Sequence, residues 1–171
     1  MKQPMIDTMV NGAYDELYTP EYAIKPLLKY IPKNAVVWEC TDYGSSNISK
    51  VILENGHKVI TTHLNTNLDF LTDMPDFDFD IIITNPPYSL KDDFIRKCYE
   101  LGKPFALLLP LTALEGIKRG EMFEKNGIEL LVLDKRVDFT GKKSCWFNTS
   151  WFCKGLLPRQ MIFEKISKEE V

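Results

Sequence analysis

The stretch DFDIIITNPPYSL, Asp78 to Leu90, joins an apolar run to an asparagine, two prolines and a tyrosine. The run from Phe79 to Thr84 is rich in β-branched residues, which predicts a central parallel strand that is buried on both faces. A single proline often ends a strand, but two in a row fix φ and keep the residue before each of them extended. We therefore expect Asn85 to Tyr88 to form a stiff polar corner at the end of this strand.

Strands and helices alternate on both sides of this stretch, with short loops between them. The expected strands are 35–39, 57–62, 79–84, 104–110 and 128–134, and the expected helices are 19–31, 47–56, 89–102 and 115–127, the first capped by Thr19. This order predicts an α/β fold: a Rossmann-like open, mostly parallel sheet with helices on both faces. Residues 150–166 predict two strands without a helix between them, and therefore an antiparallel hairpin at one edge.

The size and composition are those of one soluble globular domain. The 171 residues are expected to form a single domain, 1–171, without a separate target-recognition domain. No apolar run is long enough to cross a membrane and no export signal is visible, so we expect a cytoplasmic location. Four scattered cysteines and two histidines do not form a metal-ligand pattern, and we expect reduced thiols and no metal.

The net charge of −3 is unusual for a protein that grips nucleic acid without help. A basic patch is still conceivable in the C-terminal half, where an ordinary solvated surface is about as good an explanation. The candidates are Lys118, Arg119, Lys135, Arg136, Lys142 and Lys143.

The corner Asn85-Pro86-Pro87-Tyr88 suits the chemistry of a planar amine. The Asn85 side chain and the Pro86 backbone each supply a carbonyl oxygen, and Tyr88 supplies a flat ring. Two fixed acceptors can hold both N–H bonds of an exocyclic amino group and direct its lone pair toward an electrophile on the other side. A rigid surface turn is the simpler alternative for this motif.

With these residues the sequence resembles the class I S-adenosylmethionine-dependent amino-methyltransferases that carry an N-P-P-Y signature. The resemblance runs from Tyr18 to the final strands. It implies that YTP contacts the methionine end of the cofactor, that VVWE and the next loop form the first strand and cofactor loop, and that the aspartate of LDF accepts from the cofactor adenine. The implied catalytic residues are Asn85, Pro86, Pro87 and Tyr88, and the implied cofactor-binding residues are Tyr18, Thr19, Pro20, Glu39, Gly44, Asp69 and Phe70.

Two loops depart from the family pattern. The acid-Pro-x-x-Gly-x-Gly loop has become Glu39-Cys40-Thr41-Asp42-Tyr43-Gly44-Ser45-Ser46, with a single glycine and a bulky tyrosine. The acid expected after the second strand is absent, and His63 or Asn65 could instead contact a ribose hydroxyl. Either S-adenosylmethionine binds in an adapted way, which we favour because the catalytic corner is whole, or the pocket serves another ligand or none.

The resemblance leaves several acceptors open. Adenine N6 in DNA or RNA is our first hypothesis, because N-P-P-Y with YTP before it most resembles adenine methyltransferases of the small phage type. Guanine N2 in RNA and a protein glutamine amide are alternatives. Tyr88, Arg136, Phe139 and Trp146 are the candidate substrate-binding residues, since aromatic rings can stack a flipped or single-stranded base. A protein partner could supply sequence specificity.

Other classes of protein stand beside this hypothesis. A catalytically idle methyltransferase-like module that binds a nucleotide or a partner protein would account for both altered loops. A hydrolase is disfavoured because neither a metal-ligand cluster nor a G-x-S-x-G elbow is present. A dinucleotide dehydrogenase is disfavoured because Gly44 alone does not make a G-x-G-x-x-G loop.

Overall fold

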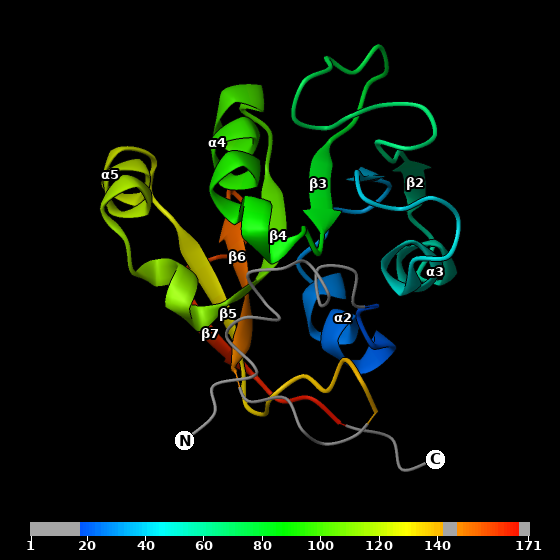
Figure 1. The fold of residues 1–171 in the computed structure, drawn as a ribbon. Helices are drawn as coiled ribbons and strands as arrows, with labels where there is room; N and C mark the ends of the chain where they lie inside the picture. The colour runs from blue at the N-terminus through cyan, green and yellow to red at the C-terminus, as the bar shows by residue number, and fades with distance from the viewer. Residues whose placement is uncertain (1–17, 142–146, 168–171) are drawn as a thin grey trace, which may run out of the picture.

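The computed structural model describes residues 18–141 and 147–167, and these build one seven-stranded sheet. The strands lie in the order β2-β1-β3-β4-β6-β5-β7 (Figure 1). Their bounds are Val36–Glu39 (β1), Lys58–Thr61 (β2), Ile81–Thr84 (β3), Phe105–Pro110 (β4), Glu129–Leu133 (β5), Thr149–Lys154 (β6) and Met161–Glu164 (β7). As predicted from its apolar run, β3 is fully buried and pairs in parallel with β1 and β4.

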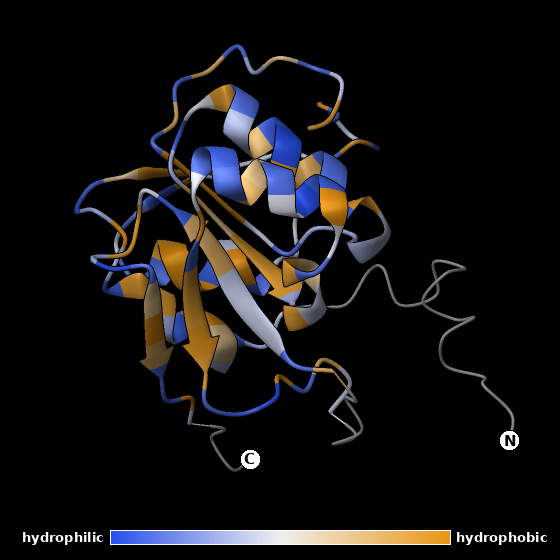
Figure 2. Cartoon of the chain, turned by 90° about the vertical axis from the view of Figure 1, so that its left-hand side faces the viewer, coloured by the Kyte–Doolittle hydropathy of each residue, from blue (hydrophilic) through white to orange (hydrophobic). Residues whose placement is uncertain are grey.

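Helices cover both faces of the sheet, which confirms the predicted fold class. On one face lie α2 (Glu21–Leu28) and α3 (Asn47–Glu54), and on the other lie α4 (Lys91–Leu101) and α5 (Ile117–Asn126) (Figure 1). Each pair packs against its own hydrophobic cluster, one on either side of the strands. In Figure 2 the strands lie as a mainly hydrophobic layer between helices of mixed colour. No helix in the described part of the chain is long and apolar enough to span a bilayer.

The predicted edge hairpin is wrong in its pairing, although the antiparallel strand exists. β6 lies between β4 and β5 and is antiparallel to both, whereas β7 lies at the edge and is parallel to β5. The connection between β6 and β7 is held by Glu129 at the start of β5. Its carboxylate accepts hydrogen bonds from the backbone N–H groups of Gly155, Leu156 and Leu157 at 2.8–3.1 Å. This anchor carries the chain across the amino end of β5 to its far side.

The start of the first helix also differs from the prediction. Pro20 is the N-cap of α2, no side chain caps the helix, and Thr19 precedes it with a buried hydroxyl that has no hydrogen-bond partner within the described residues. Pro26 lies inside the last turn, where it neither ends nor delays the helix. The indole N–H of Trp151 donates to the Ala23 carbonyl at 2.8 Å and fixes the helix to the sheet.

The fold places five loops at one rim of the sheet. β1 to β4 end there because all pairings among them are parallel, and β5 ends there because β4 and β5 are both antiparallel to β6. β6 begins at the same rim because Thr149 pairs with Pro110, the last residue of β4. In open α/β sheets ligands bind at this rim. The altered loops and the N-P-P-Y corner therefore share one end of the molecule.

Candidate functional site

A pocket opens at this rim above β1, β2 and β3. Its cavity volume is about 140 Å³. Four segments line it: Tyr18-Thr19 before α2, the loop after β1, the loop after β2, and the corner after β3. The lining residues are Tyr18, Thr19, Glu39, Thr41, Asp42, Tyr43, Ser45, Ser46, Ile48, His63, Leu64, Asn65, Asn85 and Pro87. Four of the predicted cofactor residues or candidates, Tyr18, Thr19, Glu39 and His63, thus meet the predicted catalytic corner.

Glu39 forms the buried acidic floor of this pocket. Its Oε1 accepts hydrogen bonds from the Thr41 backbone N–H, the Thr41 hydroxyl and the Thr84 hydroxyl at 3.1, 3.0 and 2.5 Å. Its Oε2 accepts from the Ser46 hydroxyl at 3.0 Å. Burial raises the pKa of Glu39 to about 7, against the opposing effect of these hydrogen bonds. The carboxyl group therefore titrates close to neutral pH.

Asp42 organises the loop between β1 and α3 from within. Its Oδ1 accepts from the backbone N–H groups of Gly44, Ser45 and Ser46 at 2.7, 2.9 and 3.0 Å. Its Oδ2 accepts from the Ser49 hydroxyl at 2.7 Å. Burial alone would raise the pKa of Asp42, but the hydrogen bonds from Ser49 and the loop outweigh it and lower the pKa. A side-chain anion thus accepts the N–H groups of three successive loop residues.

Three aromatic side chains form the rim of the pocket. The Tyr18 hydroxyl lies 3.1 Å from the Ser45 hydroxyl and 3.5 Å from the Tyr43 hydroxyl. The Tyr43 and His63 rings meet edge to face with centroids 4.7 Å apart. Tyr43 is 55% exposed, so it lines the pocket without filling it.

The loop after β2 brings His63 and Asn65 into the pocket lining. His63 Nδ1 accepts the backbone N–H of Asn65 at 3.1 Å. In a neutral imidazole the ring proton is then on Nε2, which makes this nitrogen a hydrogen-bond donor. The His63 carbonyl accepts from the N–H groups of the next turn, which fixes the loop. Both candidates for a ribose contact, His63 and Asn65, line the pocket.

Other predicted cofactor residues lie outside the pocket lining. Phe70 is 2% exposed and stacks on Phe94 with ring centroids 4.9 Å apart, so it belongs to the core. Asp69 Oδ1 accepts the backbone N–H of Leu71 at 2.9 Å and so caps a turn. Pro20 caps α2. Gly44 supplies the positive φ of 121° that the loop needs, where a residue with a side chain would be strained.

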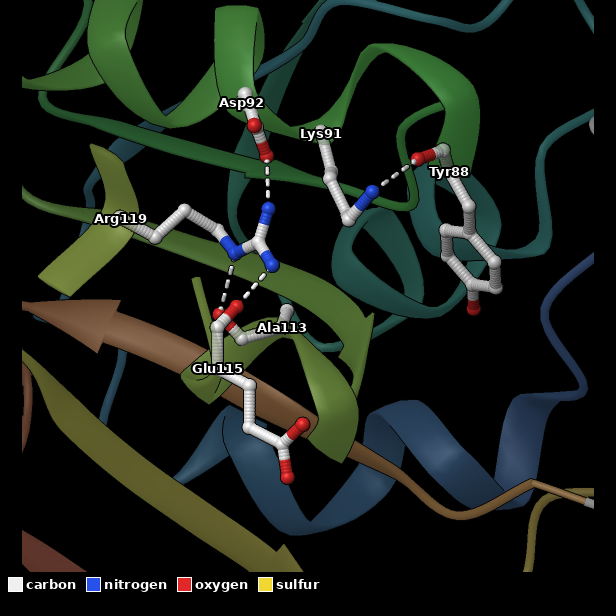
Figure 3. A network of polar contacts seen from close by, with 6 residues as sticks. All are labelled: Tyr88, Lys91, Asp92, Ala113, Glu115 and Arg119. Carbon is white, nitrogen blue, oxygen red and sulfur yellow. Dashed lines mark hydrogen bonds and ion pairs between the residues drawn. The ribbon is translucent and has the colours of Figure 1, made fainter. Parts of the chain in front are cut away.

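The predicted catalytic corner follows β3 as expected. Asn85 and Pro87 face the pocket, Pro86 is buried, and Pro87 is the N-cap of a short 3-10 turn, Tyr88–Leu90. The Lys91 ammonium donates to the Tyr88 carbonyl at 3.2 Å and so closes this turn (Figure 3). The corner stands between the pocket on one side and the end of β4 on the other.

On the β4 side, aromatic rings continue outward from the corner. The Tyr88 ring meets Phe147 edge to face at 5.9 Å, and Phe147 stacks on Phe139 at 6.2 Å. Arg136 Nε donates to the Asn148 side chain at 2.9 Å. The structure thus joins three of the predicted substrate residues, Tyr88, Phe139 and Arg136, into one region, and the fourth, Trp146, lies outside the described residues together with Lys142 and Lys143.

Several residues of the site had no clear signal in the sequence. Phe147 had no signal of its own, and only its ring contact with Tyr88 places it beside the corner. Thr41, Asp42, Ser46 and Thr84 were ordinary polar residues in or before loops, and only their contacts with Glu39 and with the loop give them a role.

Arg119 is a structural clamp and does not belong to a basic surface patch. Its Nε donates to the Ala113 carbonyl at 2.7 Å, its Nη1 pairs with Asp92 at 2.6 Å, and its Nη2 donates to the Glu115 carbonyl (Figure 3). Gly116 has φ 130°, and a Cβ there would lie 2.7 Å from Arg119 Nη2. The clamp ties the loop after β4 to the start of α4, which follows the N-P-P-Y corner.

Comparisons of sequence find no counterpart: the chain matches no protein-family model and is not detectably similar to a curated protein. Comparisons of structure find similar folds. The type I restriction-modification methyltransferase subunit from Streptococcus thermophilus superposes with a TM-score of 0.50 at 15% identity, over 91% of this chain and 50% of the other. A modification subunit assigned to a type I restriction enzyme from Vibrio vulnificus superposes with a TM-score of 0.55 at 12% identity, over 95% of this chain and 50% of the other.

The chain thus spans about half the length of these two neighbours. At such low sequence identity the likeness concerns the fold alone. Taken with the parallel sheet, the inserted antiparallel strand and the two helical layers, it shows that this chain has the Rossmann-like fold of methyltransferases.

Proposed function

We propose that this protein is an S-adenosylmethionine-dependent N-methyltransferase that acts on an exocyclic amine, with adenine N6 in DNA or RNA as the first candidate. The observation that carries the proposal is the shared pocket. Tyr18, Thr19, Glu39 and His63 come from three separate segments, and they line the same pocket as Asn85. A fortuitous N-P-P-Y turn would have no reason to meet these residues.

The charge of the pocket supports a cationic ligand. Asp42 lines it as an anion, Glu39 becomes a second anion as the pH rises through about 7, and no lysine or arginine is found among the lining residues that the structure describes. The three loop N–H groups that could have bound a phosphate already bind Asp42. Such a site favours a sulfonium cofactor over a dinucleotide or nucleoside phosphate.

The residues of the corner suit the transfer step. S-adenosylmethionine, when bound, supplies an electrophilic methyl group on a positively charged sulfur. The Asn85 side-chain carbonyl and the Pro86 carbonyl would accept the two N–H bonds of the acceptor amine and orient its lone pair toward the cofactor pocket. The amine nitrogen would accept the methyl group that the cofactor supplies, and the surplus amine proton would leave to solvent. The contribution of the protein is positioning and fixed dipoles.

The nature of the acceptor rests on further support. Tyr88, Phe147 and Phe139 offer aromatic faces beside the corner, and base–aromatic stacking contributes about 1–3 kcal/mol per base. The two structural neighbours are subunits of restriction-modification systems, which is consistent with a nucleic-acid target. Because this chain spans half of their length, we propose that a partner or a further segment supplies sequence recognition. We also propose a cytoplasmic location, where such targets are found.

Titration calorimetry with S-adenosylmethionine and S-adenosylhomocysteine tests the proposal first. We expect micromolar dissociation constants, equivalent to roughly −8 kcal/mol. The Asn85→Ala variant is the matched control, since it should keep cofactor affinity but lose about a hundredfold of methyl transfer to adenine-containing oligonucleotides. Transfer that survives in Asn85→Ala would contradict the assigned role of the corner.

A second candidate function is favoured by two observations. The loop that contacts the cofactor in the family is closed here by Asp42, and the loop after β2 lacks a carboxylate at the ribose position. A methyltransferase-like binding module would need neither an open cofactor loop nor a carboxylate at the ribose position. Absence of heat with both cofactor forms, from protein shown to be folded, would favour this second function.

A further inference from the structure

β6 begins with two buried hydroxyl groups that have no hydrogen-bond partner in the described part of the chain. Thr149 is 3% exposed and Ser150 is 0% exposed. A buried hydroxyl without a partner lowers stability, and native structures contain few of them. Such a group is commonly explained by a ligand or an ordered water that completes its hydrogen bonds.

The two hydroxyls lie on opposite faces of the sheet, because side chains alternate along a strand. Ser150 shares its face with Phe152, in the core beneath α4 and α5. Thr149 shares its face with Trp151, on the side of α2. The ladder continues one residue before β6, since the Asn148 carbonyl accepts from Leu111 N–H at 2.9 Å. Thr149 begins β6 two residues after Phe147, whose ring meets Tyr88.

The strand register sets Thr149 at the same rim of the sheet as the N-P-P-Y corner. Thr149 pairs with Pro110 of β4, and Leu107 of β4 pairs with Thr84, the residue before the corner. β3 ends at Thr84, three residues before the level of Pro110, and Asn85 follows there. Only β4 lies between β3 and β6, so these two strands are about 10 Å apart across the sheet. A heteroaromatic ring placed over the end of β4 can be hydrogen-bonded at both ends.

We propose that the Thr149 hydroxyl hydrogen-bonds the ring edge of the acceptor and so selects a nucleobase over an amide. This inference rests on the proposed methyltransferase function and names the substrate class of the same site. The Asn85 carbonyl holds the exocyclic amine, the contacting aromatic rings of Tyr88 and Phe147 lie on one side of the base, and Thr149 contacts a ring nitrogen or carbonyl at the far edge. A hydroxyl both donates and accepts. A glutamine amide has no second polar edge at that distance.

Thr149→Val and Ser150→Ala make a matched pair of variants, since each removes one buried hydroxyl that lacks a partner. We expect both to keep a melting temperature equal to or above that of the unchanged protein. Both should also keep their affinity for S-adenosylhomocysteine. With a random-sequence single-stranded oligodeoxynucleotide, Thr149→Val should raise KM for the oligonucleotide about threefold to tenfold, as expected for one lost neutral hydrogen bond. Ser150→Ala should leave KM unchanged.

Oligonucleotides that carry 1-deaza- or 7-deaza-adenine identify the contacted atom. With one of these oligonucleotides, the KM of the unchanged protein should rise by the same factor, whereas the KM of Thr149→Val should not change. Thr149→Ser keeps the hydroxyl and should have the KM of the unchanged protein. If Thr149→Val does not fold, a raised KM for Thr149→Ser would contradict the proposed contact. Equal KM values for Thr149→Val and Ser150→Ala would overturn the proposal.

A binding measurement separates this inference from the proposed function. If the unchanged protein transfers no methyl group, the same oligonucleotides are titrated into protein saturated with S-adenosylhomocysteine. Weaker binding by Thr149→Val alone supports the nucleobase contact even though transfer has failed. Equal binding by all variants, or no binding by any of them, overturns it.

Discussion

Glu39 offers a test of the site that needs no ligand. The perturbation is Glu39→Gln, which keeps the size and polarity of the side chain but removes its proton equilibrium. The carboxyl is fully buried and accepts hydrogen bonds from Thr41, Thr84 and Ser46, and its pKa is raised to about 7 by burial. The unfolded chain exposes the same group to water, where its pKa returns to 4.5.

The size and sign of the effect follow from linkage. Between pH 4.5 and pH 7 the folded state keeps the Glu39 proton while the unfolded state has lost it. The free energy of unfolding therefore falls as the pH rises through this window. The stabilisation is fully present below pH 4.5 and lost above pH 7. At about 1.4 kcal/mol per pKa unit, the shift corresponds to about 3 kcal/mol.

Urea unfolding at several pH values between 5 and 8 measures this effect. The free energy of unfolding of the unchanged protein, minus that of Glu39→Gln, should fall by about 2–3 kcal/mol across the series. Asp42→Asn is the control: the folded-state pKa of Asp42 is lowered, so this carboxylate is ionised in both states above pH 5 and its difference should stay flat. A flat difference for Glu39→Gln as well would refute the account of a proton-bearing acidic floor.

Three further predictions concern the frame around the site. Arg119→Lys should lower the free energy of unfolding by about 1–3 kcal/mol in urea, because lysine cannot contact Asp92 and two carbonyls at once; Arg96→Lys, at an exposed ion pair, should cost under about 0.5 kcal/mol. Phe70→Ala should cost about 3–5 kcal/mol in the same assay yet leave ligand affinity unchanged, since Phe70 packs in the core; a loss of affinity at equal foldedness would place it in the site. Burial raises the pKa of the Cys40, Cys98 and Cys153 thiols, so iodoacetamide should modify them slowly in the folded protein and readily in urea, as mass spectrometry can show.

The sequence predicted features whose cause is local. The apolar run before Asn85 predicted β3 and its central place, and alternation of strands and helices predicted both helical layers. The position of β6 escaped prediction, because it depends on an anchor between Glu129 and a turn about 26 residues away along the chain. Local propensity contains no information about such a contact.

The same distinction applies to the site. The order of the motifs brought Tyr18, Glu39 and Asn85 into consideration, and the structure puts them around one pocket. A sequence motif does not show which way a side chain faces. Phe70 was therefore predicted to contact the cofactor, although it packs against Phe94. The role of Asp42 could not be foreseen, since an aspartate in a loop is ordinarily a surface residue and only the direction of three backbone N–H groups reveals its function.

The hydrogen bonds of Asp42 also decide when the loop after β1 loses its conformational entropy. In a glycine-rich loop the chain remains free until a ligand arrives, and part of the binding energy is spent on ordering it. Here the carboxylate orders Gly44 to Ser46 when the protein folds, before any ligand is present. Association then needs no loop closure, and the amide hydrogens of these three residues should exchange slowly in the free protein. A missing glycine signature can thus mark a loop that is rigid in advance, with its function intact.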